Sequence, residues 1–204
     1  PTYGRVSRYG LIADGSSLDQ IGPIATTVED VAIVLSIIEG KDLHDATSVV
    51  LDDPTSEDVS FDLAGVRIGV PKEYFIDGMD EDVAARIREA IETLKKGGAE
   101  IVNMSLPLAP YALPAFYIIQ PAEASSNLAR FDGMRYGNRG EGAIEESYRS
   151  ARGAGLGAEA KRRIMLGTFI LSAGYYDAFY KKAIAVRAAM KMEFDAALKK
   201  VDVI

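Results

Sequence analysis

The chain has 204 residues, of which 48% are apolar, 26% charged and 8% aromatic, so it is expected to be globular with a sizeable core. It has no cysteine and one histidine, His44, which excludes disulfide frameworks, thiolate nucleophiles and zinc sites built from Cys and His. The net charge of −7 argues against general nucleic-acid binding by the chain alone, so a partner would have to supply a basic surface.

The N-terminal part of the chain is expected to form loops followed by one helix. Residues 3–24 are rich in glycine and turn residues, which predicts short strands and functional loops. Thr26 and Glu29 have the spacing of a capping box, which predicts a helix that starts at Thr26 and ends at Gly40. Apolar residues of this helix occupy most of its circumference, so the helix should be buried on most sides. The longest apolar stretch, 31–38, is far shorter than the ~20 residues that span a bilayer, and no membrane association is expected.

The middle of the chain predicts a βαβ unit. Residues 41–62 are polar, acidic and lack periodicity, so they are expected to be a surface connection. A strand at 66–71, an amphipathic helix at about 80–96 and a strand at 99–106 then follow one another. A connection of this length makes the two strands parallel with a right-handed crossover, and the fold class is therefore α/β.

The second half of the chain is expected to be mainly helical. Prolines break the segment 111–130, which should be helical in pieces, and a loop at 131–142 follows it. Two further helices are predicted at about 158–170 and 175–200. Residues 201–204 alternate like the beginning of a strand, so we expect the sequence to be an internal piece of a longer protein. An ordinary C-terminal edge strand is the alternative.

Two patterns suggest chemistry that their surroundings argue against. Residues 153–158 match a dinucleotide-binding fingerprint, but the segment before them, 145–152, is polar and helix-like, so a flexible loop entering a helix is favoured. His44 could act as a general base. It lies in the acidic segment, where a solvated surface histidine is the better interpretation, and Ser-His-Asp catalysis is rejected with it.

Two serine pairs could contain a nucleophile if a base lay within hydrogen-bond reach. Ser16 and Ser17 lie in a turn, where hydroxyls commonly bond to backbone groups, and this structural role is favoured. Ser125 and Ser126 lie in a predicted helix near Glu123, where helix-surface positions are the favoured interpretation.

Arginine and tyrosine supply the remaining candidates. Arg162 and Arg163 precede an apolar run, and a guanidinium there could bind a carboxylate or phosphate through two parallel hydrogen bonds. The alternative is a solvated pair that neutralises Asp or Glu side chains. Tyr117 could be a core aromatic residue with its hydroxyl paired.

The chain resembles the amidase signature family over essentially its whole length. The blocks that carry the resemblance include Pro-Thr-Tyr-Gly-Arg-Val-Ser-Arg-Tyr-Gly-Leu from Pro1 and Ser-Ser-Leu-Asp-Gln-Ile-Gly-Pro from Ser16. The Phe-Asp-Gly block at 131–133 and the Lys-Arg-Arg-Ile-Met-Leu-Gly block at 161–167 are similar to the branch of the family that serves tRNA-dependent amidation. Asp14 and Gly15 depart from the pattern, since relatives usually carry bulkier or less polar residues there.

The resemblance implies an amidase-signature fold, a mixed sheet flanked by helices that is incomplete here, with 1–204 forming the central to C-terminal part of a single domain. Members of this branch hydrolyse glutamine through a serine nucleophile, which a second serine and a lysine activate. The ammonia passes to the B subunit, which uses ATP and magnesium to activate mischarged glutamyl-tRNA(Gln) or aspartyl-tRNA(Asn). The C subunit completes a heterotrimer. The expected location is the cytoplasm of a bacterium or an organelle.

By the same resemblance, Tyr117 and Arg163 correspond to glutamine-binding residues, and the arginine faces the α-carboxylate of the substrate. No catalytic residue is expected in this chain, because the family's two serines and lysine precede the segment that begins at Pro1. The acidic partner of the substrate amino group is expected beyond Ile204. No metal or cofactor is expected in this chain, and the chain alone is expected to be inactive. A stand-alone amidase acting on small amides and a non-catalytic binding domain are the alternatives.

Overall fold

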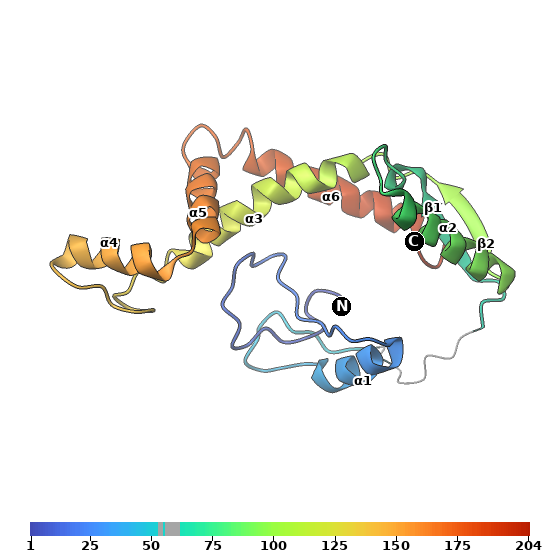
Figure 1. Ribbon diagram of the computed structural model, residues 1–204, viewed down its shortest axis with the longest axis horizontal. Coiled ribbons are helices and arrows are strands. Elements are labelled where there is room, and N and C mark those ends of the chain that lie inside the picture. Colours follow the sequence, from blue (N-terminus) through green and yellow to red (C-terminus); the bar gives the residue numbers. More distant parts are fainter. Residues whose placement is uncertain (53–54, 56–61) are drawn as a thin grey trace. The chain divides into compact units, whose positions relative to one another are not determined.

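The structure is a computed structural model that describes residues 1–52, 55 and 62–204 (Figure 1). The described residues form two compact units. The first contains residues 1–52, 55 and 118–176, and the second contains 62–117 and 177–204. The predicted surface connection, 41–62, lies partly outside the described residues, and its described part, 41–52, forms turns and irregular backbone.

The second unit is built on a small parallel sheet. Strands β1 (Arg67–Pro71) and β2 (Glu100–Met104) pair in parallel with Ile68 opposite Ile101, and helix α2 (Glu81–Lys96) connects them. This is the predicted βαβ unit, and the α/β class is confirmed. The helix begins where the Asp80 side chain accepts hydrogen bonds from two backbone N–H groups of its first turn. It ends before Gly98, whose φ of +104° suits a residue without a Cβ.

The C-terminal residues extend this sheet on the free side of β1. Val203 forms a parallel bridge with Ile68, and its carbonyl accepts a 2.7 Å hydrogen bond from Gly69 N–H. Asp202 pairs with Arg67 at 2.7 Å, and this arginine lowers the pKa of the aspartate to about 2. The strand predicted to begin at 201–204 is limited to this single bridge at Val203. In the part of the chain that the structure describes, the antiparallel strands of the expected mixed sheet do not occur.

Two short 3₁₀ turns and one long helix complete the second unit. The turns are η1 (Lys72–Tyr74) and η2 (Ala109–Tyr111), and the helix is α6 (Tyr180–Ala197). The predicted helix began near residue 175, but the backbone N–H groups of Tyr175 and Tyr176 both donate to the Ser172 carbonyl in a turn. Gly174 lies in this turn with a φ of +87°, which interrupts helical geometry. The core of the unit includes Leu106 and Val201, which are 0% and 1% exposed.

Helix α3 (Ala112–Leu128) runs from the second unit into the first. The sequence predicted a helix in pieces, and this was wrong because the segment forms one helix. Pro114 lies in the first turn, where its missing N–H has no partner to lose. Pro121 lies inside the helix and removes the donor that would bond to the carbonyl of Tyr117. The helix continues because its first-unit half is tightly packed, with Ala122 and Ala124 at 1% and 0% exposed.

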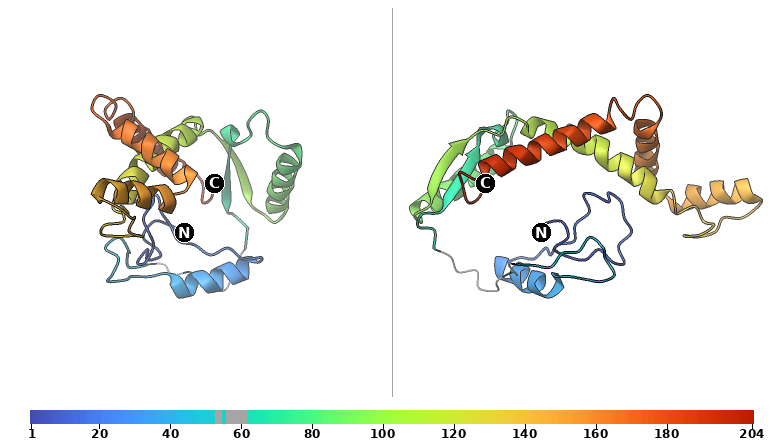
Figure 2. Two further views of the ribbon diagram at one scale, coloured as in Figure 1. Left: turned by 60° about the vertical axis from the view of Figure 1, so that its left-hand side comes forward. Right: turned by 180° about the vertical axis from the view of Figure 1, so that it is seen from behind.

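The first unit also contains helices α4 (Ile144–Gly155) and α5 (Ala158–Leu171), shown in orange in Figures 1 and 2. Helices α3 and α5 cross in close contact at Gly167. A Cβ at this position would collide with the Pro121 carbonyl and with the Ser125 side chain. The glycine therefore lets the two backbones approach. The helix predicted at 158–170 is confirmed to within one residue.

Helix α1 (Val28–Ile38) differs from its prediction in two ways. Its N-cap is Thr27, which accepts a 3.1 Å hydrogen bond from Asp30 N–H, rather than Thr26. Adjacent threonines offer two starting positions, and acidic residues follow both of them. The helix is also not buried on most sides, since Val28 and Ile37 are 68% and 75% exposed and only its Ala32 side is buried. Among the described helices, none is both long enough and apolar enough to cross a membrane.

Candidate functional site

Arg163 lies near the start of α5, on the side of the helix that packs against α3. It precedes Gly167 by one turn and Ile170 by two, and both of these residues are buried. The Arg163 side chain is 32% exposed, and its Nε donates a 2.7 Å hydrogen bond to Glu159. Among the described residues, its two terminal nitrogens have no partner. These nitrogens are the donors that could bind a carboxylate.

Glu159 binds both arginines of the pair. Arg162 donates from Nε and Nη2 to the two carboxylate oxygens at 2.8 Å each, and Arg163 shares one of them. Hydrogen bonds from Arg162 first and Arg163 second lower the pKa of the Glu159 carboxyl to about 2. Arg162 and Arg163 therefore neutralise an acidic side chain, which is the alternative that the sequence analysis gave for this pair. The role of Arg163 in binding substrate stays a prediction.

Tyr117 lies in α3 at the end of the second unit, while Arg163 belongs to the first. Its ring makes an edge contact with Phe116, with the two centroids 5.6 Å apart, and the residue is 49% exposed. The phenolic hydroxyl has no hydrogen-bond partner in the described part of the chain. A core aromatic with a paired hydroxyl is therefore the wrong description of Tyr117, and its role in glutamine binding stays a prediction.

The serine pairs have structural contacts. Ser17 donates from its backbone N–H and its hydroxyl to the two carboxylate oxygens of Glu123, at 2.9 and 2.5 Å. Ser16 accepts a 2.7 Å hydrogen bond from the Asn127 amide. The turn that carries both serines is thus fixed to α3. Their role is structural as predicted, but the hydroxyls bond to side chains of α3 and not to the expected backbone groups.

Ser125 and Ser126 donate to the Ala122 carbonyl one helical turn earlier, at 2.9 and 3.4 Å. The expected helix-surface position is wrong for Ser125, which is 8% exposed. The close crossing at Gly167 covers it, and the sequence pattern did not reveal this crossing.

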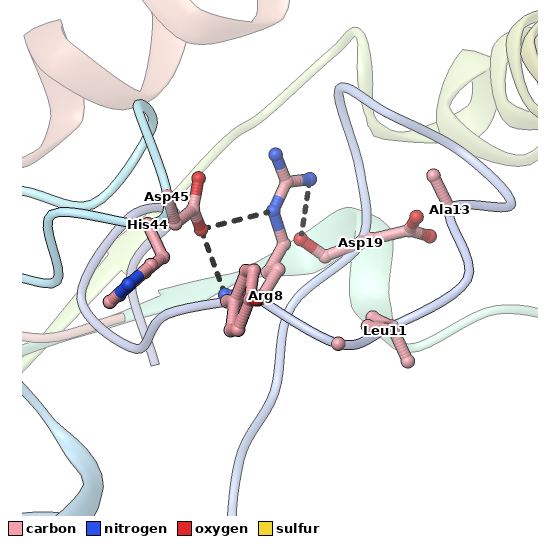
Figure 3. Close-up of a pocket in the computed structure, with 8 residues that line it drawn as sticks. Arg8, Leu11, Ala13, Asp19, His44 and Asp45 are labelled. Carbon is pink, nitrogen blue, oxygen red and sulfur yellow. Dashed lines mark hydrogen bonds and ion pairs between the residues drawn. The ribbon is translucent and has the colours of Figure 1, made fainter.

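Arg8 is a residue that the sequence reasoning did not single out. Its guanidinium donates to the Ser16 carbonyl at 2.8 Å and to the hydroxyls of Tyr3 and Thr47 at 2.9 and 3.1 Å. It lines a cavity of about 270 Å³ together with Asp45 (Figure 3). The backbone N–H of Arg8 and then the Thr47 hydroxyl lower the pKa of Asp45 to about 2. Arg8 therefore joins loop segments that are far apart in the sequence.

The two patterns that were set aside lack the surroundings that their chemistry needs, although the loop expected at 153–158 is limited to Leu156 and Gly157. His44 has a 69% exposed side chain that contacts Asp42 at 2.9 Å, as predicted for a surface histidine. The segment 153–158 is the end of α4, a short connection and the first residue of α5, with a helix rather than a strand before it. Within the described ranges, no group of three His, Cys, Asp or Glu residues is placed to hold a metal ion.

The comparison with known families decides the relationship of this chain. The sequence model of the amidase family matches residues 1–204. The chain belongs to the amidase family. This confirms the resemblance that the sequence blocks carried, and it places the chain in a family of enzymes.

Curated amidase relatives are similar to the whole chain. The chain is 58% identical to the A subunit of glutamyl-tRNA(Gln) amidotransferase from Roseiflexus castenholzii and 55% identical to that from Chloroflexus aggregans. Each match covers 100% of this chain and 42% of the relative, so the chain spans less than half the length of these relatives.

A solved structure of the same kind of subunit matches the fold. The crystal structure of the glutamyl-tRNA(Gln) amidotransferase A subunit from Thermotoga maritima matches with a TM-score of 0.73 and 39% identity. The match covers 98% of this chain and 39% of that structure. The predicted amidase-signature fold is therefore confirmed.

Proposed function

We propose that this chain is part of the glutaminase subunit of a tRNA-dependent amidotransferase. In this reaction, glutamine is hydrolysed to glutamate, and the ammonia converts glutamyl-tRNA(Gln) or aspartyl-tRNA(Asn) into glutaminyl- or asparaginyl-tRNA. The observation that carries the proposal is the 58% identity, along the entire chain, to a relative named as the A subunit of such an enzyme. The partners in this proposal are the B and C subunits, of which the first uses the ATP and magnesium. The location that goes with it is the bacterial cytoplasm or an organelle.

Arg163 binds the α-carboxylate of glutamine in this proposal. Glu159 accepts from Nε, which leaves the two terminal nitrogens for the two oxygens of a carboxylate. The Glu159 contact also restricts the rotamers of a long side chain, so less entropy is lost when substrate binds. The family resemblance also assigns glutamine binding to Tyr117, which has an exposed aromatic ring and a hydroxyl without a partner among the described residues.

Hydrolysis itself requires a nucleophile. A serine oxygen attacks the side-chain carboxamide carbon of glutamine, and the proton that the serine loses is passed to the amide nitrogen. The C–N bond then breaks and ammonia leaves. Water then cleaves the glutamyl ester and regenerates the serine. The family resemblance assigns none of the serines of this chain to this step. Ser17 and Ser125 already donate their hydroxyls to Glu123 and to the Ala122 carbonyl.

The experiment uses the protein expressed from its complete reading frame, with and without the B and C subunits. We expect the assembled complex to form glutaminyl-tRNA from glutamyl-tRNA(Gln), glutamine, ATP and magnesium. We also expect one glutamate to be released for each amidation. Hydrolysis of small amides by the protein alone, without any tRNA amidation by the complex, would instead establish a stand-alone amidase. Absence of both reactions in a folded protein that still binds a ligand would establish a binding domain.

A further inference from the structure

Segments of α3, α4 and α5 within the first unit line an open cavity of about 480 Å³ at the surface. Arg163 is not among its lining residues, which come from the end of α3, the end of α4 and another side of α5. Pockets that hold small molecules measure roughly 300–1,000 Å³ and are lined mainly by apolar side chains. The cavity has this size and this kind of lining. Its apolar walls include Leu128, Ala129, Leu156, Ile164 and Met165.

The close crossing of α3 and α5 explains why the cavity exists. At Gly167 the two backbones meet without an intervening side chain. Ile164 and Thr168 lie on either side of this glycine on α5 and face the cavity with Ser125 of α3. Leu156, which follows α4, supplies another wall. Since helices and a helix end form these walls, the cavity does not depend on a long loop.

Two cations line the cavity without an acidic partner. The Arg152 guanidinium lies over the Tyr148 ring, 5.6 Å from its centroid, and among the described residues no carboxylate binds it. The Lys161 ammonium gives one hydrogen bond of 2.7 Å to the Gly153 carbonyl, which leaves two of its donors. No Asp or Glu belongs to the described lining of this cavity.

This positive charge contrasts with the neighbouring arginines and with the chain as a whole. Arg149 pairs with Glu145 at 2.9 Å, and Arg162 and Arg163 pair with Glu159. Residues 130–163 contain eight Lys and Arg against five Asp and Glu, although the whole chain has a net charge of −7. An apolar cavity beside two uncompensated cations is complementary to a ligand with an apolar body and one anionic end.

We propose that this cavity binds a small apolar carboxylate, whose hydrocarbon part packs against the leucine, isoleucine and methionine walls while its carboxylate contacts Arg152 and Lys161. This inference does not rest on the proposed function of the protein. Arg152 offers two parallel donors to the carboxylate, and Lys161 adds one point charge.

The test measures binding of 4-phenylbutyrate to the complete protein by isothermal titration calorimetry. Its neutral analogue, 4-phenylbutan-1-ol, has the same apolar body without the charge. We expect the carboxylate to bind at least about tenfold more tightly than the alcohol, because hydrogen bonds to a charged group are stronger than those to a neutral hydroxyl. Equal affinities for the two compounds would overturn the proposal.

Matched variants separate this cavity from general surface charge. Arg152→Gln should weaken 4-phenylbutyrate binding about tenfold or more, since it removes one of the two cations. Arg149→Gln, which removes an arginine of the same helix that does not line the cavity, should leave the affinity unchanged. Equal losses in the two variants would show that only the overall charge matters.

A third variant tests the apolar walls. Ala129→Phe adds an aromatic ring at an exposed position just after α3 and should abolish binding by filling the cavity. Circular dichroism and the thermal midpoint of each variant verify that it is folded. Unchanged affinity in a folded Ala129→Phe protein would place the probe elsewhere and contradict the assignment.

Discussion

Helix α5 carries positively charged side chains on two sides. The charge on one side is paired with a carboxylate, and the charge on the other side is not. Arg163, on the side that packs against α3, shares the Glu159 carboxylate with Arg162. On the cavity side, Lys161 and its neighbour Arg152 have no acidic partner among the described residues. An arginine fixed by a carboxylate keeps donors in a defined direction, whereas uncompensated cations raise the local potential for any anion. The comparison shows that position along the sequence does not decide the role of a cation, since Lys161 and Arg163 are only two residues apart.

The largest expected effect comes from the helix crossing on which both sides depend. Gly167→Ala places a methyl group against the Pro121 carbonyl and should destabilise the protein by about 1–3 kcal/mol, as overpacked substitutions do. Urea denaturation of the complete protein measures this change. The control is Gly155→Ala, because a Cβ at Gly155 meets no atom within 4 Å. Equal stability of the two variants would contradict the close crossing.

A smaller effect is expected when the partner of Arg163 is removed. Glu159→Gln takes away the charge that fixes the guanidinium, and ion pairs of this exposure contribute little because solvent screens them. We therefore expect the KM for glutamine to rise up to about fivefold while kcat changes little. Steady-state glutaminase kinetics on the full complex provide the measurement. A fall in kcat with an unchanged KM would mean that Glu159 does not act through substrate binding.

The pKa of the Glu159 carboxyl reports directly on its ion pairs with Arg162 and Arg163. Because the folded-state pKa is lowered to about 2, the pair's contribution to stability is complete above the ordinary carboxyl pKa and is lost as the pH falls through about 2. An NMR titration of the Glu159 carboxyl should have its midpoint there. Arg162→Gln should raise the midpoint more than Arg163→Gln, since Arg162 is the larger cause. A midpoint near 4.5 in the unsubstituted protein would exclude the pairing.

The smallest effect is expected at a pair that resembles Glu159 and Arg163 only in spacing. Arg149 and Glu145 are also four residues apart, but both side chains are more than three quarters exposed, at 76% and 86%. Arg149→Gln should therefore change stability by less than about 0.5 kcal/mol and leave the KM for glutamine unchanged. Thermal denaturation and the same kinetic assay verify both points. A rise in KM comparable to that of Glu159→Gln would remove the distinction between the two pairs.

Local signals in the sequence predicted the helices and strands better than their packing. Helix α2 was predicted correctly because Asp80 and Gly98 have chemistry that marks helix ends. Helix α3 was wrongly divided because the tertiary contacts that stabilise it around Pro121 come from a helix far along the chain. The exposed faces of α1 also differ from the prediction, since an apolar pattern indicates that a helix can be buried and not which surface covers it.

The sequence predicted which residues belong to the candidate site but not how their side chains are arranged in space. Arg163 was identified through the Lys-Arg-Arg-Ile-Met-Leu-Gly block, and its spacing from Glu159 could have suggested the ion pair. The cavity beside Arg152 could not have been predicted from the sequence, because it depends on how closely α3 and α5 approach at Gly167. Arg8 was missed for a similar reason, since its partners Ser16 and Thr47 come from separate loops.

The most direct test of the proposed function compares two nitrogen donors in the Arg163→Ala complex. Formation of glutaminyl-tRNA is measured once with glutamine and once with ammonium chloride, which bypasses glutamine binding. We predict that the glutamine-dependent kcat/KM falls by about 10- to 150-fold, the loss of about 1.5–3 kcal/mol for hydrogen bonds to a charged group, while the ammonium-dependent rate is unchanged. A glutamine-dependent kcat/KM equal to that of the unsubstituted complex would contradict the assignment of Arg163 to the substrate carboxylate. An equal loss of activity with glutamine and with ammonium chloride would contradict it too.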